Sequence, residues 1–479
     1  MRKEKVPAMK RQLLLGISIL WIGAGCATHP KVPDLAILYN RAAQYHGVDR
    51  NPVIVIPGVM GSRLEEKETK VPVWGAFSGE FINPKKPEGA RLFALPMAEG
   101  IALEELRDNV VSVSALDRIE LTVLGLPLEL DAYANILRTL GVGGYMDQQL
   151  SEAGAIDYGD GHFTCFQFHF DWRRSNVENA KALHEFILEK RKDVRADLKE
   201  RYGVDNASVK FDIVAHSMGG LITRYFLRYG NQPLPQDGST PRLTWAGAEL
   251  VERVVLVGTP SGGSAEVIGK LRDGLSLGPL AKYSPAILGT FPSLYELMPR
   301  PRHGAFVDVT DPSRKLDNYD PSLWQELGWG LAADDQESVL AELLPDVVDA
   351  NERRRIALDH QEKCLKQARQ FHEALDLPAA FPETATLQLI AGDAEDTPLV
   401  LGADLQTGAV TVLASGPGDG TVARYSALLD ERMGAEWTPY LVTPIQWDHV
   451  TFLFQDHLGM TKDPMFTDNI LYLLLEAPR

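Results

Sequence analysis

One short segment constrains the fold of this chain more than any other. It runs from a continuous apolar stretch, through a single serine, into a helical pattern, and residues 211–220 read FDIVAHSMGG. An apolar run of this length is typical of a parallel strand that is buried on both faces. Leu221, Ile222, Tyr225 and Phe226 then recur at helical spacing. The segment therefore predicts a strand, a tight turn at the serine, and a helix.

The serine in this turn is a candidate nucleophile. In a nucleophile elbow the serine occupies a strained turn, so the residues two before and two after it must be small. Ala215 and Gly219 flank Ser217 in this way. The alternative is that Ser217 only caps the helix that follows. We assign it as the nucleophile, because a strand before it and a helix after it are the context that confirms the motif.

Further runs along the chain repeat the alternation of strand and helix. Ser175 and Glu178 are spaced as a capping box at the start of one helix. This alternation predicts an α/β fold with a mostly parallel sheet and helices on both faces. We expect strands within 51–58 and at 163–168, 210–215, 251–257, 386–391, 408–413 and 450–454, and helices that begin at Ser175, Gly219 and Pro464.

Two stretches interrupt this alternation within a domain that we expect to span 51–479. Residues 64–128 are irregular, and residues 265–385 combine many apolar side chains with a charged helix expected over 346–375. Catalytic folds vary through their loops, so we interpret both stretches as insertions that cap the active-site edge of the sheet. The alternative for the apolar residues is that they form core between the cap helices.

An elbow serine needs an oxyanion hole and a base. The hole takes one amide from the residue after the serine, here Met218, and one from a loop after an early strand. Residues 57–62 (PGVMGS) offer such a loop, although they also read as a plain turn. The base should follow a parallel strand, where the sheet edge forms a crevice. His457 follows the strand at 450–454, whereas His449 precedes it, so we favour His457.

The triad acid should fall between the serine and the histidine in the sequence. Asp419 follows the strand expected at 408–413, while Asp393 and Asp396 follow the one at 386–391. Both loops are rich in glycine and both could be ordinary turns. The residues alone leave this choice open.

Several motifs together resemble the lecithin:cholesterol acyltransferase family of α/β-hydrolases. They are PVIVIPGVMGSRLE, HFDWRR, VAHSMGGL, LVGTPSGGS, GDGTV and DHLG. The resemblance implies Ser217 as nucleophile, Asp419 as acid, His457 as base, and the amides of Met60 and Met218 as the oxyanion hole. It implies a structural role for Asp171, Trp172 and Arg173. Ser261 stands where the animal enzymes have Trp, which argues against acylation of cholesterol.

The first 25 residues read as a targeting segment. Arg2, Lys3, Lys5, Lys10 and Arg11 precede the uncharged run 12–25, and Cys26 follows at once. This resembles a bacterial lipoprotein signal, with Cys26 as the lipidated residue and 26–50 as a tether. An ordinary signal peptide or an uncleaved anchor is the alternative. We expect an envelope location on a membrane.

Composition excludes other classes of protein. The net charge of −17 argues against a nucleic-acid partner, because a strongly acidic protein repels phosphate backbones. Three cysteines are too few for a disulfide scaffold, and the sequence has no spacing typical of a metal site. Cys165 and Cys364 read as buried thiols, which an envelope location would allow to pair. We therefore predict a cofactor-free serine acylhydrolase or acyltransferase for lipid esters, phospholipid or acylglycerol, in which hydrolysis predominates over transfer. The alternatives are an esterase for soluble esters and a non-catalytic envelope protein that binds lipid or a partner.

Overall fold

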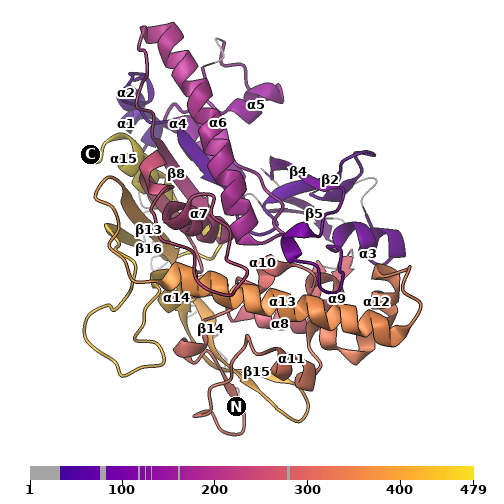
Figure 1. Cartoon of the computed structure of the whole chain (residues 1–479). Helices are drawn as coiled ribbons and strands as arrows, with labels where there is room; N and C mark the ends of the chain where they lie inside the picture. Colours follow the sequence, from indigo (N-terminus) through magenta and orange to yellow (C-terminus); the bar gives the residue numbers. More distant parts are fainter. Residues whose placement is uncertain are drawn as a thin grey trace, which may run out of the picture.

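A computed structural model describes residues 33–75, 82–116, 119–123, 126–130, 132–159, 162–277 and 281–478. Six parallel strands form its central sheet (Figure 1). The predicted α/β class with a mostly parallel sheet is confirmed. In spatial order the strands are β16 (His449–Leu453), β13 (Thr386–Gly392), β9 (Val251–Val257), β8 (Phe211–His216), β1 (Val53–Ile56) and β7 (Cys165–Gln167).

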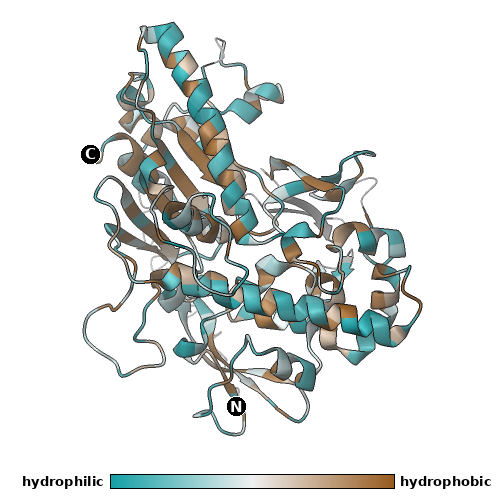
Figure 2. Cartoon of the chain, viewed as in Figure 1, coloured by the Kyte–Doolittle hydropathy of each residue, from teal (hydrophilic) through white to brown (hydrophobic). Residues whose placement is uncertain are grey.

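Helices cover both faces of this sheet, which is why its inner strands are buried along almost their whole length and are mostly apolar. On one face α6 (Asn176–Tyr202) and α7 (Met218–Tyr229) share a core with alternate residues of the strands. On the other face α4 (Ala132–Val142) and α15 (Pro464–Leu475) pack against the remaining strand residues. Figure 2 shows the strands in brown behind the mostly teal visible face of α6.

Helix α6 begins where the sequence predicts, but its cap differs from a capping box. The Ser175 hydroxyl accepts from the amide of Val177, at 3.1 Å. The carboxylate that completes the cap is Glu296, which accepts from the Asn176 amide at 2.6 Å and from the Ser175 hydroxyl at 2.7 Å. Glu178 instead faces Arg107, at 2.8 Å. A cap residue distant in sequence thus ties the start of α6 to the later insertion.

The two insertions hold most of the remaining elements. The first contributes β2 (Ser62–Glu66), β3 (Pro72–Trp74), α3 (Pro87–Phe93), β4 (Val110–Ala115), β5 (Ile119–Val123) and β6 (Leu126–Leu130). The second contributes α8 (Glu266–Asp273), β10 (Leu275–Leu277), β11 (Ala281–Tyr283), α9 (Pro285–Leu288), α10 (Pro292–Tyr295), β12 (Phe306–Asp308), α11 (Pro321–Leu327), α12 (Glu337–Leu343) and α13 (Ala350–Asp376). In Figure 1 the helices of the second insertion gather below the central sheet, and α13 crosses the group.

The strand expected at 408–413 belongs to a different sheet. The structure has β15 (Val410–Gly418), which pairs with β14 (Glu395–Ala403) as a hairpin and extends, with β12, into a three-stranded sheet. The hairpin begins directly after β13, and the chain after it comes back beside the end of β13 and continues into α14 (Arg424–Leu428). The hydrophobic pattern of residues 408–413 therefore predicts a strand correctly, but it does not indicate which sheet that strand joins.

The expected signal segment, Cys26 and the first part of the tether lie outside the described residues. Residues 33–50 are packed on the domain through α1 (Leu35–Leu38) and α2 (Asn40–Ala43). Buried Tyr39 donates to Asp468 of α15 at 2.7 Å, and Arg50 donates to the carbonyl of Gly143. No helix in the described part of the chain is long and apolar enough to span a bilayer.

Candidate active site

Ser217 lies at the turn between β8 and α7 and has the strained backbone that the motif predicts. Its φ of 53° and ψ of −124° are rarely adopted by a residue with a side chain. A Cβ at Gly219 would lie 2.3 Å from the carbonyl oxygen of Pro57, and one at Gly220 would lie 1.9 Å from Oγ1 of Thr259. Both glycines thus allow the elbow to pack directly against the loops that follow β1 and β9.

The structure brings Ser217, His457 and Asp419 into one hydrogen-bonded line. Nε2 of His457 lies 3.0 Å from Oγ of Ser217, and Nδ1 lies 2.8 Å from Oδ2 of Asp419. The other carboxylate oxygen of Asp419 accepts from the amides of Val422 at 2.6 Å and Thr421 at 3.0 Å. Asp419 is buried, with 2% of its surface exposed. Its carboxylate is therefore fixed on both sides, and it orients the imidazole.

The alternative residues lie elsewhere. His449 opens β16 at the opposite end of that strand and is exposed. Asp396 is exposed at the start of the β14–β15 hairpin. Asp393 follows β13 but forms an ion pair with Arg424. Of the two histidines and three aspartates considered, only His457 and Asp419 contact each other in the line to Ser217.

The loop at 57–61 lies beside the elbow and offers a free amide. Met60 has a positive φ of 62°, and its carbonyl accepts from Nε1 of Trp74 at 2.8 Å, which fixes the peptide between Met60 and Gly61. Among the described residues, nothing accepts a hydrogen bond from the amide of Met60 or of Met218. Both amides are therefore available as donors, as an oxyanion hole requires.

The two glycines of this loop serve close packing rather than a special backbone conformation. A Cβ at Gly58 would lie 2.7 Å from Cβ of Ser217, and one at Gly61 would lie 2.7 Å from the hydroxyl of Tyr133. The positive φ of the loop is at Met60 instead. The two glycines are therefore explained by close packing against Ser217, Pro57 and Tyr133.

Two residues at the site were not found from the sequence. His216 is 1% exposed; its Nε2 lies 3.2 Å from the carbonyl oxygen of His457 and its Nδ1 lies 3.3 Å from the hydroxyl of Tyr133. Burial, followed by the nearby His457, lowers the pKa of His216 to about 3, so this imidazole is neutral. Tyr133 begins a helix whose apolar spacing at Tyr133, Ile136, Leu137 and Leu140 was a usable signal.

The Asp-Trp-Arg segment connects both insertions to the core. Arg173, which is fully buried, pairs with Asp171 at 2.7 Å and with Asp108 at 2.8 Å. Nε1 of Trp172 donates to the carbonyl of Ser62 at 3.2 Å, and the Trp172 carbonyl accepts from Ser293 at 2.6 Å. None of these contacts involves Ser217, and each ties the chain beside the 57–61 loop to its surroundings.

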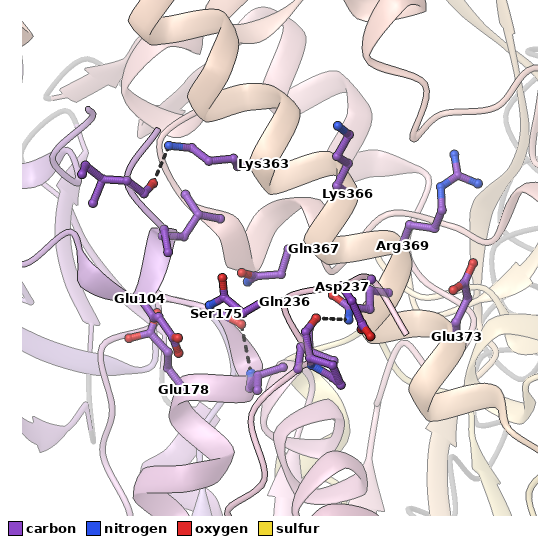
Figure 3. Close-up of a pocket in the computed structure, with 18 of the residues that line it drawn as sticks. Glu104, Ser175, Glu178, Gln236, Asp237, Lys363, Lys366, Gln367, Arg369 and Glu373 are labelled. Atoms are coloured by element: carbon purple, nitrogen blue, oxygen red, sulfur yellow. Dashed lines mark hydrogen bonds between the residues drawn. The ribbon is translucent and has the colours of Figure 1, made fainter. Parts of the chain in front are cut away.

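A separate cavity of about 640 Å³ opens between α6 and α13 (Figure 3). Charged side chains of both signs surround it, among them Glu104, Glu178, Lys363 and Arg369. Lys363 is already bound to the carbonyl oxygens of Ala98 and Ile101. The three residues of the catalytic line do not border this cavity, which is distinct from the candidate active site.

The described residues hold no cluster of His, Cys, Asp and Glu suited to a metal ion. Cys165 and Cys364 are both buried and free, so the structure does not pair them. The Cys165 thiol donates to Asp147 at 3.2 Å, and burial raises the pKa of both thiols well above the ordinary value.

Comparison with known proteins agrees with this architecture. The family model for lecithin:cholesterol acyltransferase matches residues 149–334, which include the elbow and the Asp-Trp-Arg segment. A chain of the Tle4–Tli4 complex aligns with a TM-score of 0.56 and 17% identity over 90% of this chain and all of that chain. The mature Bacillus licheniformis lipase BlEst2 aligns with a TM-score of 0.29 and 11% identity over 90% and 95% of the two chains. Curated protein sequences give no significant match.

The predicted resemblance is thus confirmed over the central segment, while the motifs at 52–65, 418–422 and 456–459 lie outside the matched range. The similarity to the Tle4–Tli4 chain extends the fold over nearly the whole chain. The chain has the α/β-hydrolase fold, and its residues 149–334 carry the signature of the lecithin:cholesterol acyltransferase family.

Proposed function

We propose that the protein is a serine acylhydrolase that cleaves lipid esters through an acyl-enzyme on Ser217. The observation that carries this proposal is the line from Ser217 through His457 to Asp419, beside the amides of Met60 and Met218, for which the described part of the chain provides no acceptor. A base that touches the nucleophile and is itself oriented by a buried carboxylate is the arrangement of serine hydrolases.

In the proposed reaction Nε2 of His457 takes the proton of Ser217 as Oγ attacks the ester carbonyl carbon. The carbonyl oxygen gains the negative charge and rests on the amides of Met60 and Met218. His457 then gives its proton to the leaving alcohol oxygen as the ester bond breaks. Water, activated by the same histidine, releases the acid and restores Ser217. Asp419 keeps Nδ1 protonated throughout and needs no proton of its own.

The family match supports a lipid ester as the substrate. Only 7% of Ser217 is exposed, so the nucleophile is screened from open solvent. Phe291, Tyr295 and Trp324 are buried members of that insertion. The interior of the second insertion is thus apolar.

Hydrolysis is the outcome that we expect to dominate over transfer to another alcohol. Transfer wins only where an acceptor pocket orients an alcohol and water is excluded. Ser261, which stands where the animal enzymes have Trp, is fully buried in the loop after β9. A serine offers little apolar surface for a sterol in that loop, so water is the favoured acceptor.

A fluorophosphonate probe and product analysis test the proposal. Wild-type protein should react covalently with the probe at Ser217, and incubation with phosphatidylcholine vesicles should release free fatty acid that mass spectrometry detects. The same vesicles with cholesterol or a simple alcohol should give less acceptor ester than free acid. Absence of labelling would leave a binding protein with the hydrolase fold, and an excess of acceptor ester would make the protein an acyltransferase.

We further propose that Cys26 carries a lipid anchor in the bacterial envelope. The run at 12–25 is uncharged and is followed directly by Cys26, seven residues before the described part of the chain begins. Two acyl chains on one cysteine hold a protein on a membrane far more firmly than a single chain. Such an anchor would keep the enzyme close to its lipid substrate.

A further inference from the structure

One chain of hydrogen bonds passes behind Ser217 and joins the two sides of the site. The amide of Gly58 lies 2.6 Å from the hydroxyl of Tyr133, which lies 3.3 Å from Nδ1 of His216. Nε2 of His216 lies 3.2 Å from the carbonyl oxygen of His457. The loop that holds Met60 and the loop that holds the base are therefore connected through two side chains that touch no reacting atom.

The direction of every proton in this chain is fixed by its two ends. Gly58 supplies a backbone N–H, which can only donate, and His457 supplies a carbonyl, which can only accept. His216 is neutral and has one N–H. That hydrogen must be on Nε2 to satisfy the carbonyl, so Nδ1 accepts from the hydroxyl of Tyr133. The same hydroxyl accepts from the amide of Gly58, so every donor and acceptor in this chain of hydrogen bonds has a partner.

Both ends of the chain are also bound from their other side. The loop is held two residues after Gly58, where Nε1 of Trp74 donates to the carbonyl of Met60, and the amide of His457 donates to the carbonyl of Asp419 at 2.9 Å. His216 and Tyr133 are 1% and 7% exposed, so water does not compete for these bonds. Buried and fully satisfied networks of this kind rigidify the groups that they join.

We propose that Tyr133 and His216 are positioning residues, which hold the 57–61 loop and the backbone of His457 in one fixed arrangement around Ser217. The oxyanion donor at Met60 and the base then meet the same transition state without reorganisation. This inference rests on the proposed function. It also gives a reason for a histidine before the nucleophile, since a neutral imidazole offers one donor and one acceptor on opposite sides.

The test must separate this role from a contribution to core packing, because Tyr133 also lies in the apolar core beside α15. Tyr133→Phe removes only the hydroxyl. Tyr225→Phe is the matched control: Tyr225 is fully buried and its hydroxyl donates to the carbonyl of Gln232 at 3.1 Å, away from the site. Both variants are compared by kcat and KM on a short p-nitrophenyl ester and by thermal unfolding.

We expect Tyr133→Phe to lower kcat by about 10- to 100-fold with KM within roughly twofold, as for a weakened oxyanion donor. Binding of a trifluoromethyl ketone, which forms an oxyanion on Ser217, should weaken in parallel. Tyr225→Phe should keep the kcat of the wild type, although its melting temperature should fall by about as much as that of Tyr133→Phe. Equal kcat in Tyr133→Phe and wild type would overturn the inference, and so would an equal loss in both phenylalanine variants.

His216 provides a second test that does not depend on Tyr133. His216→Gln keeps one donor and one acceptor, whereas His216→Met keeps neither, so we expect the glutamine variant to retain a kcat at least about tenfold above that of the methionine variant. Equal kcat in the two variants would contradict the inference. An inert wild-type protein would reject the proposed function itself, which is a different result from an active enzyme that tolerates these changes.

Discussion

Asp419 binds His457 twice, once through its side chain and once through its backbone. Its Oδ2 lies 2.8 Å from Nδ1 of His457, and its carbonyl oxygen accepts from the amide of His457 at 2.9 Å. Asp419 ends a hairpin and His457 follows the edge strand β16, so these two contacts join two loops far apart in the sequence. The imidazole therefore cannot turn away from Ser217 without loss of a buried hydrogen bond.

Removal of the negative charge on the acid should abolish most of the activity. Asp419→Asn keeps the shape of the side chain but can present an amide N–H to Nδ1, which favours the wrong tautomer of His457. We expect kcat to fall by roughly 10³- to 10⁴-fold. Asp396→Asn, at an exposed position of the same hairpin, is the control and should keep normal kcat on a p-nitrophenyl ester. An active Asp419→Asn variant would show that another carboxylate serves as acid.

Substitution of the nucleophile should remove covalent chemistry and leave the fold intact. Ser217→Ala lacks the attacking oxygen, so we expect loss of fluorophosphonate labelling and a fall in kcat of about 10³-fold or more. Alanine keeps the positive φ at this position, where strain costs on the order of 1–3 kcal/mol in either protein, so the melting temperature should change little. Turnover at the wild-type rate in Ser217→Ala would refute the assignment.

The two late histidines should differ sharply in their effect. His457→Ala removes the group that lies 3.0 Å from Oγ of Ser217, and its activity should match that of Ser217→Ala. His449→Ala changes an exposed side chain at the other end of β16 and should keep most of the activity. Steady-state kinetics on one ester substrate decides between them, and the reverse pattern would disprove the orientation argument.

The fold was predictable where a single stretch of chain contains its own signal. The apolar run before Ser217, the glycines after it, and the serine cap of α6 each depend on neighbours within a few residues. The order of the strands in the sheet and the separate sheet of β12, β14 and β15 depend on pairings between distant segments. The hydrophobic pattern along a strand carries no information on its partners.

The site shows the same limit. Ser217 and His457 were predictable from their positions relative to strands, but the residues alone left Asp419, Asp393 and Asp396 open. The choice depends on where a hairpin of over twenty residues returns, and local sequence does not encode that path. His216 was visible only as a neighbour of the nucleophile, because its function depends on contacts with Tyr133 and His457 across the sheet.

The membrane anchor has a direct test. Cys26→Ser removes the thiol that would carry lipid, so the protein should move from the membrane fraction to the soluble fraction when cells are fractionated. A palmitate analogue fed to the cells should label the wild type and not the variant. Cys364→Ser is the matched control, since Cys364 is buried in α13 and cannot be reached by a modifying enzyme without unfolding. Label that persists in Cys26→Ser would exclude this anchor.

Glu296 should make the stability of the protein depend on pH. Burial raises the pKa of this carboxyl to about 7, although Ser175, Asn176 and Gln367 all donate to it. The ordinary pKa is 4.5, so between these two values the folded protein holds a proton that the unfolded chain releases. The stabilisation from this group is complete below pH 4.5, and roughly 3 kcal/mol of it is lost as the pH rises to 7.

Glu296→Gln has no such proton, so its free energy of unfolding, measured with urea between pH 5 and 8, should fall less steeply than that of the wild type. Glu373→Gln, at an exposed position of α13, should keep the wild-type slope, and equal slopes in all three proteins would contradict the prediction.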